Sequence, residues 1–168
     1  MAADYLISSL QPLSFDGPAP YTMEQFTALC REQLGEHPFK SLEPVWKDLD
    51  TQIRNAIAAE RARVLGQDAG KWRRPAQGCS LFWANRVAAA FQEKDPARRD
   101  RLLDQVRWDA AGELTPAESP LSLAAAYTYA IRLEIVLRRA ALAADAGNEV
   151  FNRLTAASSP ESVLKEQN

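Results

Sequence analysis

Residues 120–144 read PLSLAAAYTYAIRLEIVLRRAALAA. Apolar side chains recur in this stretch at the spacing of one helix face: Ala126, Tyr129, Ala130, Leu133, Leu137, Ala140 and Ala144. A second stripe, on another side of the same helix, contains Tyr127, Ile131 and Leu142. Because a helix that is apolar on two sides needs neighbours on both, we expect the central helix of a bundle here, roughly 36 Å long.

Charged residues exclude this helix as a membrane span. Its second half contains Arg132, Glu134, Arg138 and Arg139, and each would cost about 2.5–3.5 kcal/mol at the centre of a bilayer. The chain begins without a basic segment followed by an apolar one, so we also expect no signal peptide. These features predict a cytoplasmic protein that is peripheral to a membrane at most.

The composition is typical of a single globular domain. The chain has 168 residues, of which 46% are hydrophobic and 25% charged, and its net charge is -2. A mixed and slightly acidic balance gives no reason to expect nucleic acid or an anionic membrane as a partner. Cys30 and Cys79 lie far apart and form no CxxC motif, which favours a reduced, cytoplasmic setting.

Capping residues predict where the other helices begin and end. Thr22 and Gln25 form a capping box at the start of one helix, which Gly35 is placed to end in a left-handed cap. A longer helix runs from about Pro44 to Leu65, with Gly66 as its stop. Its apolar face comprises Trp46, Leu49, Ile53, Ala56, Ile57 and Val64.

Two charged features lie on this longer helix. Asp50 and Arg54 form an i,i+4 pair on its flank, which stabilises it by about 0.2–0.5 kcal/mol. Glu60 lies inside the apolar arc, so its carboxylate either reaches water at the edge or pairs with a buried cation.

Two further helices follow. Ser80 is suited to cap a helix over residues 81–94, and Asp95-Pro96 begins another that stops near Gly112. Their expected inward faces comprise Leu81, Ala84, Val87, Ala88 and Phe91 in the first and Leu102, Leu103, Val106 and Ala110 in the second. Residues 4–20 are rich in turn formers, and whether their apolar part forms a strand or a helical turn stays open.

The fold class follows from these elements. No stretch alternates apolar and polar residues as a strand does. Five to six helices joined by short loops predict an all-α, single-domain helical bundle. We place the domain at residues 1–157, where Val150, Phe151 and Leu154 add a last apolar face, and a flexible C-terminal tail at residues 158–168.

The sequence offers little for catalysis or for a cofactor. His37 lies in a loop without a partner motif, and no HExxH, CxxC, GxGxxG or P-loop pattern occurs. Cys30 lies on an apolar helix face, where a thiol packs inertly, and Cys79 is a lone loop cysteine near a basic segment. We therefore predict that the protein is not an enzyme and has no catalytic residue, metal or cofactor.

The sharpest local feature is the basic loop Lys71-Trp72-Arg73-Arg74. In a functional interpretation it binds an anion or a partner, with Trp72 as a stacking or anchoring residue. In a structural interpretation, which we favour because the rest of the chain is not basic, Trp72 packs on the helices among solvated arginines. The remaining tryptophans are expected to anchor the core or an interface: Trp46, Trp83 and Trp108.

Four segments together carry a family resemblance. Residues 5–30, YLISSLQPLSFDGPAPYTMEQFTALC, form the most specific one. Residues 54–66 are similar to an RNx(L/I)AxxRAxxLG stretch, and Asp95-Pro96 with residues 107–109 is similar to an NP…RWD stretch. Residues 129–151 are similar to a YxxKL…RW…GxExF ending, with Arg132 at the lysine position and Ala140 at the aromatic one. The family that these segments resemble is a bacterial one of unknown function, encoded within V-type (A/V-type) ATPase operons.

The resemblance covers most of residues 5–155 and implies a helical companion of a rotary ATPase. The ending is also similar to that of the ATPase's C (d-type) subunit, a helical funnel between central stalk and rotor ring, which is about twice as long as this chain. We therefore expect a non-enzymatic subunit or an accessory or assembly factor that binds V-type ATPase subunits and no small-molecule substrate. The residues expected to bind the partner are Arg61, Arg63, Trp72, Arg73 and Arg74.

Two other functions stay open. One is a small helical adaptor or nucleic-acid-binding module that uses the Trp72 loop, which predicts binding that weakens steeply with salt. The other is a small enzyme with an unfamiliar site, which predicts a deep polar pocket that brings Glu60, His37 or Cys79 together.

Overall fold

The computed structural model describes residues 2–142, and within them the chain is all-helical, without a strand. The predicted all-α bundle is confirmed. Its elements are α1 (Ala2–Ser9), α2 (Met23–Leu34), α3 (Glu43–Leu65), the short 3₁₀ helix η1 (Ala69–Trp72), α4 (Leu81–Ala90), α5 (Pro96–Gly112) and α6 (Leu123–Ala141). Among these elements no helix combines the length and the apolar character that crossing a bilayer requires.

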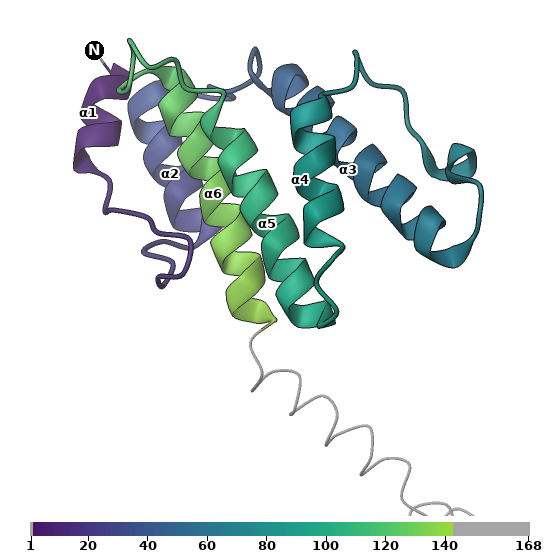
Figure 1. The fold of residues 1–168 in the computed structure, drawn as a ribbon. Coiled ribbons are helices and arrows are strands. Elements are labelled where there is room, and N and C mark those ends of the chain that lie inside the picture. The colour runs from purple at the N-terminus through teal and green to yellow at the C-terminus, as the bar shows by residue number, and fades with distance from the viewer. Residues whose placement is uncertain (1, 143–168) are drawn as a thin grey trace, which may run out of the picture.

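The helices lie side by side in an order that differs from their order in the sequence. Across the molecule they follow one another as α1, α2, α6, α5, α4 and α3 (Figure 1). α6 therefore lies in the interior of this row, where it packs on α1 and α2 on one side and on α5 on the other. Its two apolar stripes explain this central position.

α6 is shorter than the stretch that predicted it. It begins only after Ser122, whose hydroxyl caps the helix N-terminus. Ala126 and Leu133 of the first stripe are fully buried, and Ile131 of the second stripe is buried too. The prediction for Leu142 was wrong: it is 63% exposed, because it lies beyond the last turn of the helix.

The predicted caps are present, with one difference. Gln25 N–H donates to Thr22 Oγ1 at 3.2 Å and Thr22 N–H donates to Gln25 Oε1 at 2.8 Å, which completes the capping box. Asp95 caps α5, and Gly66 ends α3 in a left-handed conformation with φ +64°. Gly35 also has a positive φ, +86°, but its ψ of -170° is not that of the predicted left-handed cap.

Three apolar clusters join the helices. The first lies between α3, α4 and α5 and includes Ile53, Trp83, Val87 and Ala110. The second lies between α1, α2 and α6 and includes Leu6, Phe26, Cys30 and Leu133. The third joins α5, α6 and the loop before α2 through Phe15, Ala111, Ile131 and Ile135. The open question about residues 4–20 is thereby answered, since their apolar part forms the helix α1, which buries Leu6.

The tryptophans that were predicted as anchors serve the same clusters. Trp83 is only 3% exposed, and Trp46 and Trp108 pack against the buried residues of their clusters.

On α6, Ala140 of the first stripe is exposed like Leu142, and Ala144 lies outside the described residues. Three large apolar residues that helical spacing placed on the inward faces of α3, α4 and α5 are exposed too. Val64 is 62% exposed and Leu81 is 73% exposed, while Leu102 is 38% exposed. Val64 lies in the last turn of α3, which diverges from α5 (Figure 1). Leu81 is the first residue of α4, which ends at Ala90 instead of continuing to residue 94. Spacing fixes the direction of a side chain but does not supply the neighbour that would bury it.

Residues 143–168 lie outside the part of the chain that the structure describes. The domain boundary at residue 157, the tail at residues 158–168 and the last apolar face of Val150, Phe151 and Leu154 therefore stay predictions.

Candidate partner-binding groove

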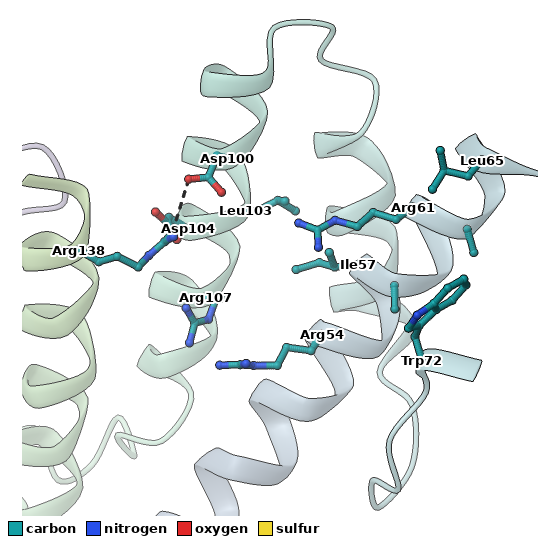
Figure 2. Close-up of a pocket in the computed structure, with 12 residues that line it drawn as sticks. Arg54, Ile57, Arg61, Leu65, Trp72, Asp100, Leu103, Asp104, Arg107 and Arg138 are labelled. Atoms are coloured by element: carbon teal, nitrogen blue, oxygen red, sulfur yellow. Dashed lines mark hydrogen bonds and ion pairs between the residues drawn. The ribbon is translucent and has the colours of Figure 1, made fainter. Parts of the chain in front are cut away.

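A groove lies between the C-terminal half of α3 and the N-terminal half of α5. Its main part, drawn in Figure 2, has a volume of about 580 Å³, and a second hollow of about 280 Å³ adjoins it. Residues common to both are Arg61, Leu65, Asp100 and Leu103. We refer to the two together as the α3–α5 groove.

The lengths of the helices explain why this groove exists. α3 has 23 residues and α4 has 10, so the two are about 34 Å and about 15 Å long. α3 therefore extends beyond the helix that packs along it, and its C-terminal half diverges from α5 (Figure 1). The small side chains of Ala58 and Ala62, one turn apart on α3, keep the space between the helices open.

The walls of the groove are apolar. In its main part they are formed by Ile57, Ala58, Ala62, Leu65, Trp72 and Leu103. Trp72, at the end of η1, lies against the last turns of α3 and is 49% exposed, while Leu65 is 68% exposed. Exposed large apolar side chains that share one hollow are typical of binding surfaces.

Guanidinium groups from three helices converge on these walls. Figure 2 shows Arg54 and Arg61 reaching from α3 towards α5, where Arg107 lies, and Arg138 reaching from α6. Arg99 lines the adjoining hollow, with its guanidinium 5.4 Å from the centre of the Phe91 ring. The groove is therefore rich in positive charge although the chain as a whole is slightly acidic.

Asp50 lies behind two of these arginines and is only 9% exposed. Its Oδ2 accepts a hydrogen bond from Arg54 Nε at 2.6 Å, and its Oδ1 accepts one from Arg107 Nε at 2.8 Å. The predicted pair of Asp50 with Arg54 is thus confirmed, and the same carboxylate also links α3 to α5. One negative charge is shared between two positive ones, which leaves this side of the groove cationic.

Asp104 is the buried carboxylate of the groove, with 1% exposure. Its Oδ1 accepts a hydrogen bond from Arg138, whose guanidinium also lies 3.6 Å from Asp100 Oδ2 (Figure 2). Its Oδ2 is buried and has no hydrogen-bond partner among the described residues. Burial raises the pKa of the Asp104 carboxyl, although Arg138 acts in the opposite direction. A buried acceptor without a donor is costly, so this oxygen needs either a donor from a ligand or a proton of its own.

The structure brings together two of the five residues predicted to bind a partner. Arg61 and Trp72 both line the groove. Arg63 does not line it; its side chain pairs with Glu60 at 2.9 Å. This contact also settles the question about Glu60, since its partner is an exposed cation one turn further along α3 and not a buried one. Arg73 and Arg74 are exposed in the loop after η1 and do not line the groove either.

The basic loop is tied to α3 by a polar side chain that the sequence did not single out. Arg74 N–H donates to Asn55 Oδ1 at 2.9 Å, and Asn55 Nδ2 donates back to the Arg74 carbonyl at 2.8 Å. This pair of bonds fixes the backbone two residues after Trp72. Trp72 is therefore half-exposed, as the functional interpretation of the basic segment requires. It also lies on a loop that is held against the helix, as the structural interpretation requires.

Six charged groove residues were not predicted as site residues: Arg54, Arg99, Asp100, Asp104, Arg107 and Arg138. A signal for three of them is present in the sequence, because positions 100, 104 and 107 lie on one face of a helix. Arg54 and Arg61, two turns apart on α3, likewise share a face. The missing information was that these two faces lie opposite each other, which only the packing of α3 and α5 provides.

The residues of the small-enzyme alternative do not come together. His37 lines a separate pocket of about 360 Å³ between α2, α3 and α6, and neither Glu60 nor Cys79 lines that pocket. Cys79 is exposed, whereas Cys30 is buried, and burial raises the pKa of the Cys30 thiol to about 11. Residues 2–142 contain no group of three or more His, Cys, Asp or Glu residues that could hold a metal ion.

The groove combines charged and apolar side chains. Its main part is lined by Arg, Asp, Leu, Ile, Ala and Trp. No protein-family model, no curated protein and no solved structure matches the chain. Function is therefore inferred from the groove together with the family resemblance of the sequence.

Proposed function

We propose that this protein is a non-enzymatic helical binding protein that holds another protein at the α3–α5 groove. More specifically, we propose a permanent component or an accessory or assembly factor of a V-type ATPase, acting near the central stalk or rotor ring as a connector similar to the C (d-type) subunit. The family resemblance over residues 5–155 supports the ATPase assignment. The chemistry of the groove supports protein binding independently of that resemblance.

One observation carries the proposal: exposed apolar side chains and arginines share one hollow. Leu65 and Trp72 are about half exposed or more and stand beside Arg54 and Arg61. Tryptophan and arginine are the residue types most enriched at the centres of protein interfaces, where a few buried anchors supply most of the affinity. Water covers these side chains in the free protein, so their burial by a partner is favourable by about 25 cal/mol per Å².

The ion pairs around the groove suit a mechanical role. Asp50 joins α3 to α5 through Arg107, and Arg138 joins α6 to α5 through Asp104. A partner seated in the groove would thus be held by helices that are cross-linked to the centre of the bundle. Such a connector transmits force through packed helices without making or breaking a covalent bond.

Recovery of partners from native membranes tests the proposal. We expect the tagged full-length protein to recover V-type ATPase subunits, and Leu65→Asp to lower that recovery about tenfold or more because it places a charge among the apolar walls. Leu81→Asp is the matched control, since Leu81 is similarly exposed but lies outside the groove. Failure of the folded wild-type protein to recover any ATPase component would contradict the assignment.

The exposed basic loop favours one alternative, a nucleic-acid-binding module. Lys71, Arg73 and Arg74 are exposed around Trp72, which suits a single strand that stacks on an aromatic ring. Binding of this kind weakens steeply as salt rises, whereas apolar anchoring does not. Titration of the full-length protein with single-stranded RNA and DNA at two salt concentrations separates the two functions.

A further inference from the structure

We propose that the α3–α5 groove binds a single amphipathic helix of the partner, with acidic residues on the side of its apolar stripe that faces α3. The inference rests on the proposed function only in taking the ligand to be a protein; it does not depend on the ATPase. Three properties of the groove lead to it: its length, its apolar walls and the pattern of its charges.

The length and walls of the groove match a short helix. From Arg54 to Leu65, α3 rises about 17 Å, which equals about 11 helical residues. Ala58 and Ala62 lie in the middle of this distance and allow a second helix to approach closely, while Ile57, Leu65 and Leu103 offer contacts around them. A groove between two helices that offers a row of apolar contacts is the usual seat of an amphipathic helix, which presents residues at i, i+3, i+4 and i+7.

The cations of the groove specify carboxylates on that helix. Arg61 is exposed and forms no ion pair with another residue of the described part. Arg54 and Arg107 share the single carboxylate of Asp50, so each keeps donors for a further acceptor. Arg54 and Arg61 lie about 10 Å apart along α3. Carboxylates two turns apart on the bound helix would therefore reach both guanidinium groups, with the geometry that Arg and carboxylate favour.

The carboxylates of α5 distinguish a protein ligand from a polyanion. Asp104 is buried beneath this side of the groove, with its Oδ2 closed to solvent, so the carboxylate that a ligand meets here is that of Asp100. Asp100, half-exposed beside it, would also repel the evenly spaced phosphates of a nucleic acid. The groove is thus cationic along α3, whereas on its other side Asp100 and Asp104 of α5 pair with Arg138 of α6, a pattern that a helix with acidic residues on one flank can match.

A synthetic peptide tests this inference with purified full-length protein. The probe is a fluorescein-labelled acidic peptide of about 14 residues, roughly 21 Å as a helix, with leucines at i, i+3, i+4 and i+7 and glutamates two turns apart on one flank of the leucines. We expect fluorescence anisotropy to show binding to the wild type, and binding about tenfold weaker, or 1.4 kcal/mol, for Arg61→Glu. Lys40→Glu, which alters an exposed cation outside the groove, is the control.

Four outcomes would overturn the inference. The first is equal binding of a peptide with lysine in place of glutamate, and the second is no effect of Arg61→Glu on peptide binding. The third is tighter, Arg61-dependent binding of a single-stranded DNA oligonucleotide. The fourth is an increase in peptide affinity of about tenfold for Phe151→Glu, which would identify residues 143–168 of the same chain as the occupant. Arg61→Gln provides a second variant if Arg61→Glu alters the circular dichroism spectrum. Peptide binding without recovery of ATPase subunits would leave this inference standing and remove only the ATPase assignment.

Discussion

Asp50 shows how one buried carboxylate can hold two helices and shape a binding site. Its two oxygens accept separate hydrogen bonds from Arg54 on its own helix and from Arg107 on α5. The two arginines are not equivalent, because the Arg54 side chain is 56% exposed and the Arg107 side chain is 23% exposed. Loss of the carboxylate would therefore leave Arg107 with a poorly solvated positive charge, whereas Arg54 can turn to water.

We predict that Asp50→Ala lowers the free energy of unfolding by about 2 kcal/mol. Arg54→Ala removes only the more exposed half of the arrangement and should cost about 0.5 kcal/mol. Urea unfolding of both variants, followed by circular dichroism, measures the difference. Equal losses for the two substitutions would show that Asp50 does not hold α5 in the way described.

Asp104 predicts a dependence of stability on pH. Burial raises the pKa of its carboxyl above 3.8, with Arg138, Asp100 and Arg107 as the charged groups that face it. The folded protein thus binds the Asp104 proton more tightly than the unfolded chain does. Its contribution to the free energy of unfolding is therefore complete below the pKa of the unfolded chain, and it is lost as pH rises through the raised pKa of the folded protein.

The Asp104→Asn variant tests this effect, because an amide does not titrate. We predict that between about pH 4 and pH 7 the melting temperature of the wild type falls relative to that of Asp104→Asn. The comparison cancels groups that both proteins share, such as Asp16, whose pKa is lowered by hydrogen bonds from Arg101 and Arg139 and which acts in the opposite direction. A difference in melting temperature that stays constant across this range would contradict the prediction.

At the scale of the elements, α3 and the loop after it form one wall of the groove, and Asn55 connects the helix to the basic part of that loop. Asn55 accepts a hydrogen bond from Arg74 N–H and donates one to the Arg74 carbonyl. Without these bonds the segment directly after Trp72 would be held to α3 only further along the loop, where Asp48 and Gln52 bond residues 77 and 80. The position of Trp72 beside Leu65 therefore depends on a contact between positions 19 residues apart in the sequence.

We predict that Asn55→Ala increases the hydrogen-exchange rate of the Arg74 amide about tenfold, since the lost bonds are worth about 1 kcal/mol or more. The stability of the whole protein should change much less than in Asp50→Ala. Exchange measured by NMR resolves this single amide, and the Gln25 amide in the capping box of α2 provides an internal control. An unchanged rate at Arg74 with the loop intact would show that other contacts hold Trp72.

The elements were predictable to different degrees, for local reasons. Thr22, Asp95 and Gly66 mark helix ends through bonds to their own neighbours, so the sequence alone reveals them. The conformation of α1 stayed open because eight residues with few capping signals depend on packing, here on the burial of Leu6. The exposure of Val64 was not predicted, because its helical spacing is that of a buried face. Among the described residues, no neighbour lies where it would bury Val64 in the last turn of α3.

At the scale of the whole molecule, α6 explains both the fold and the limits of prediction. Its two apolar stripes predict neighbours on two sides, and it packs on α1, α2 and α5. The pairing of α3 with α5 has no comparable signal, because the charged faces of both helices resemble solvated surfaces. Of the predicted partner-binding residues, Arg61 and Trp72 thus share a groove, while Arg63, Arg73 and Arg74 lie outside it.

Site-specific photo-crosslinking in cells tests most directly whether this groove is a protein-binding site. A photoreactive amino acid is introduced at Leu65, inside the groove, and in a second variant at Leu81, which is similarly exposed outside it. We predict a covalent adduct with a V-type ATPase protein at Leu65 that is absent at Leu81 and is lost with Arg61→Glu. The same adducts at both positions, or no protein adduct at Leu65, would contradict the central claim.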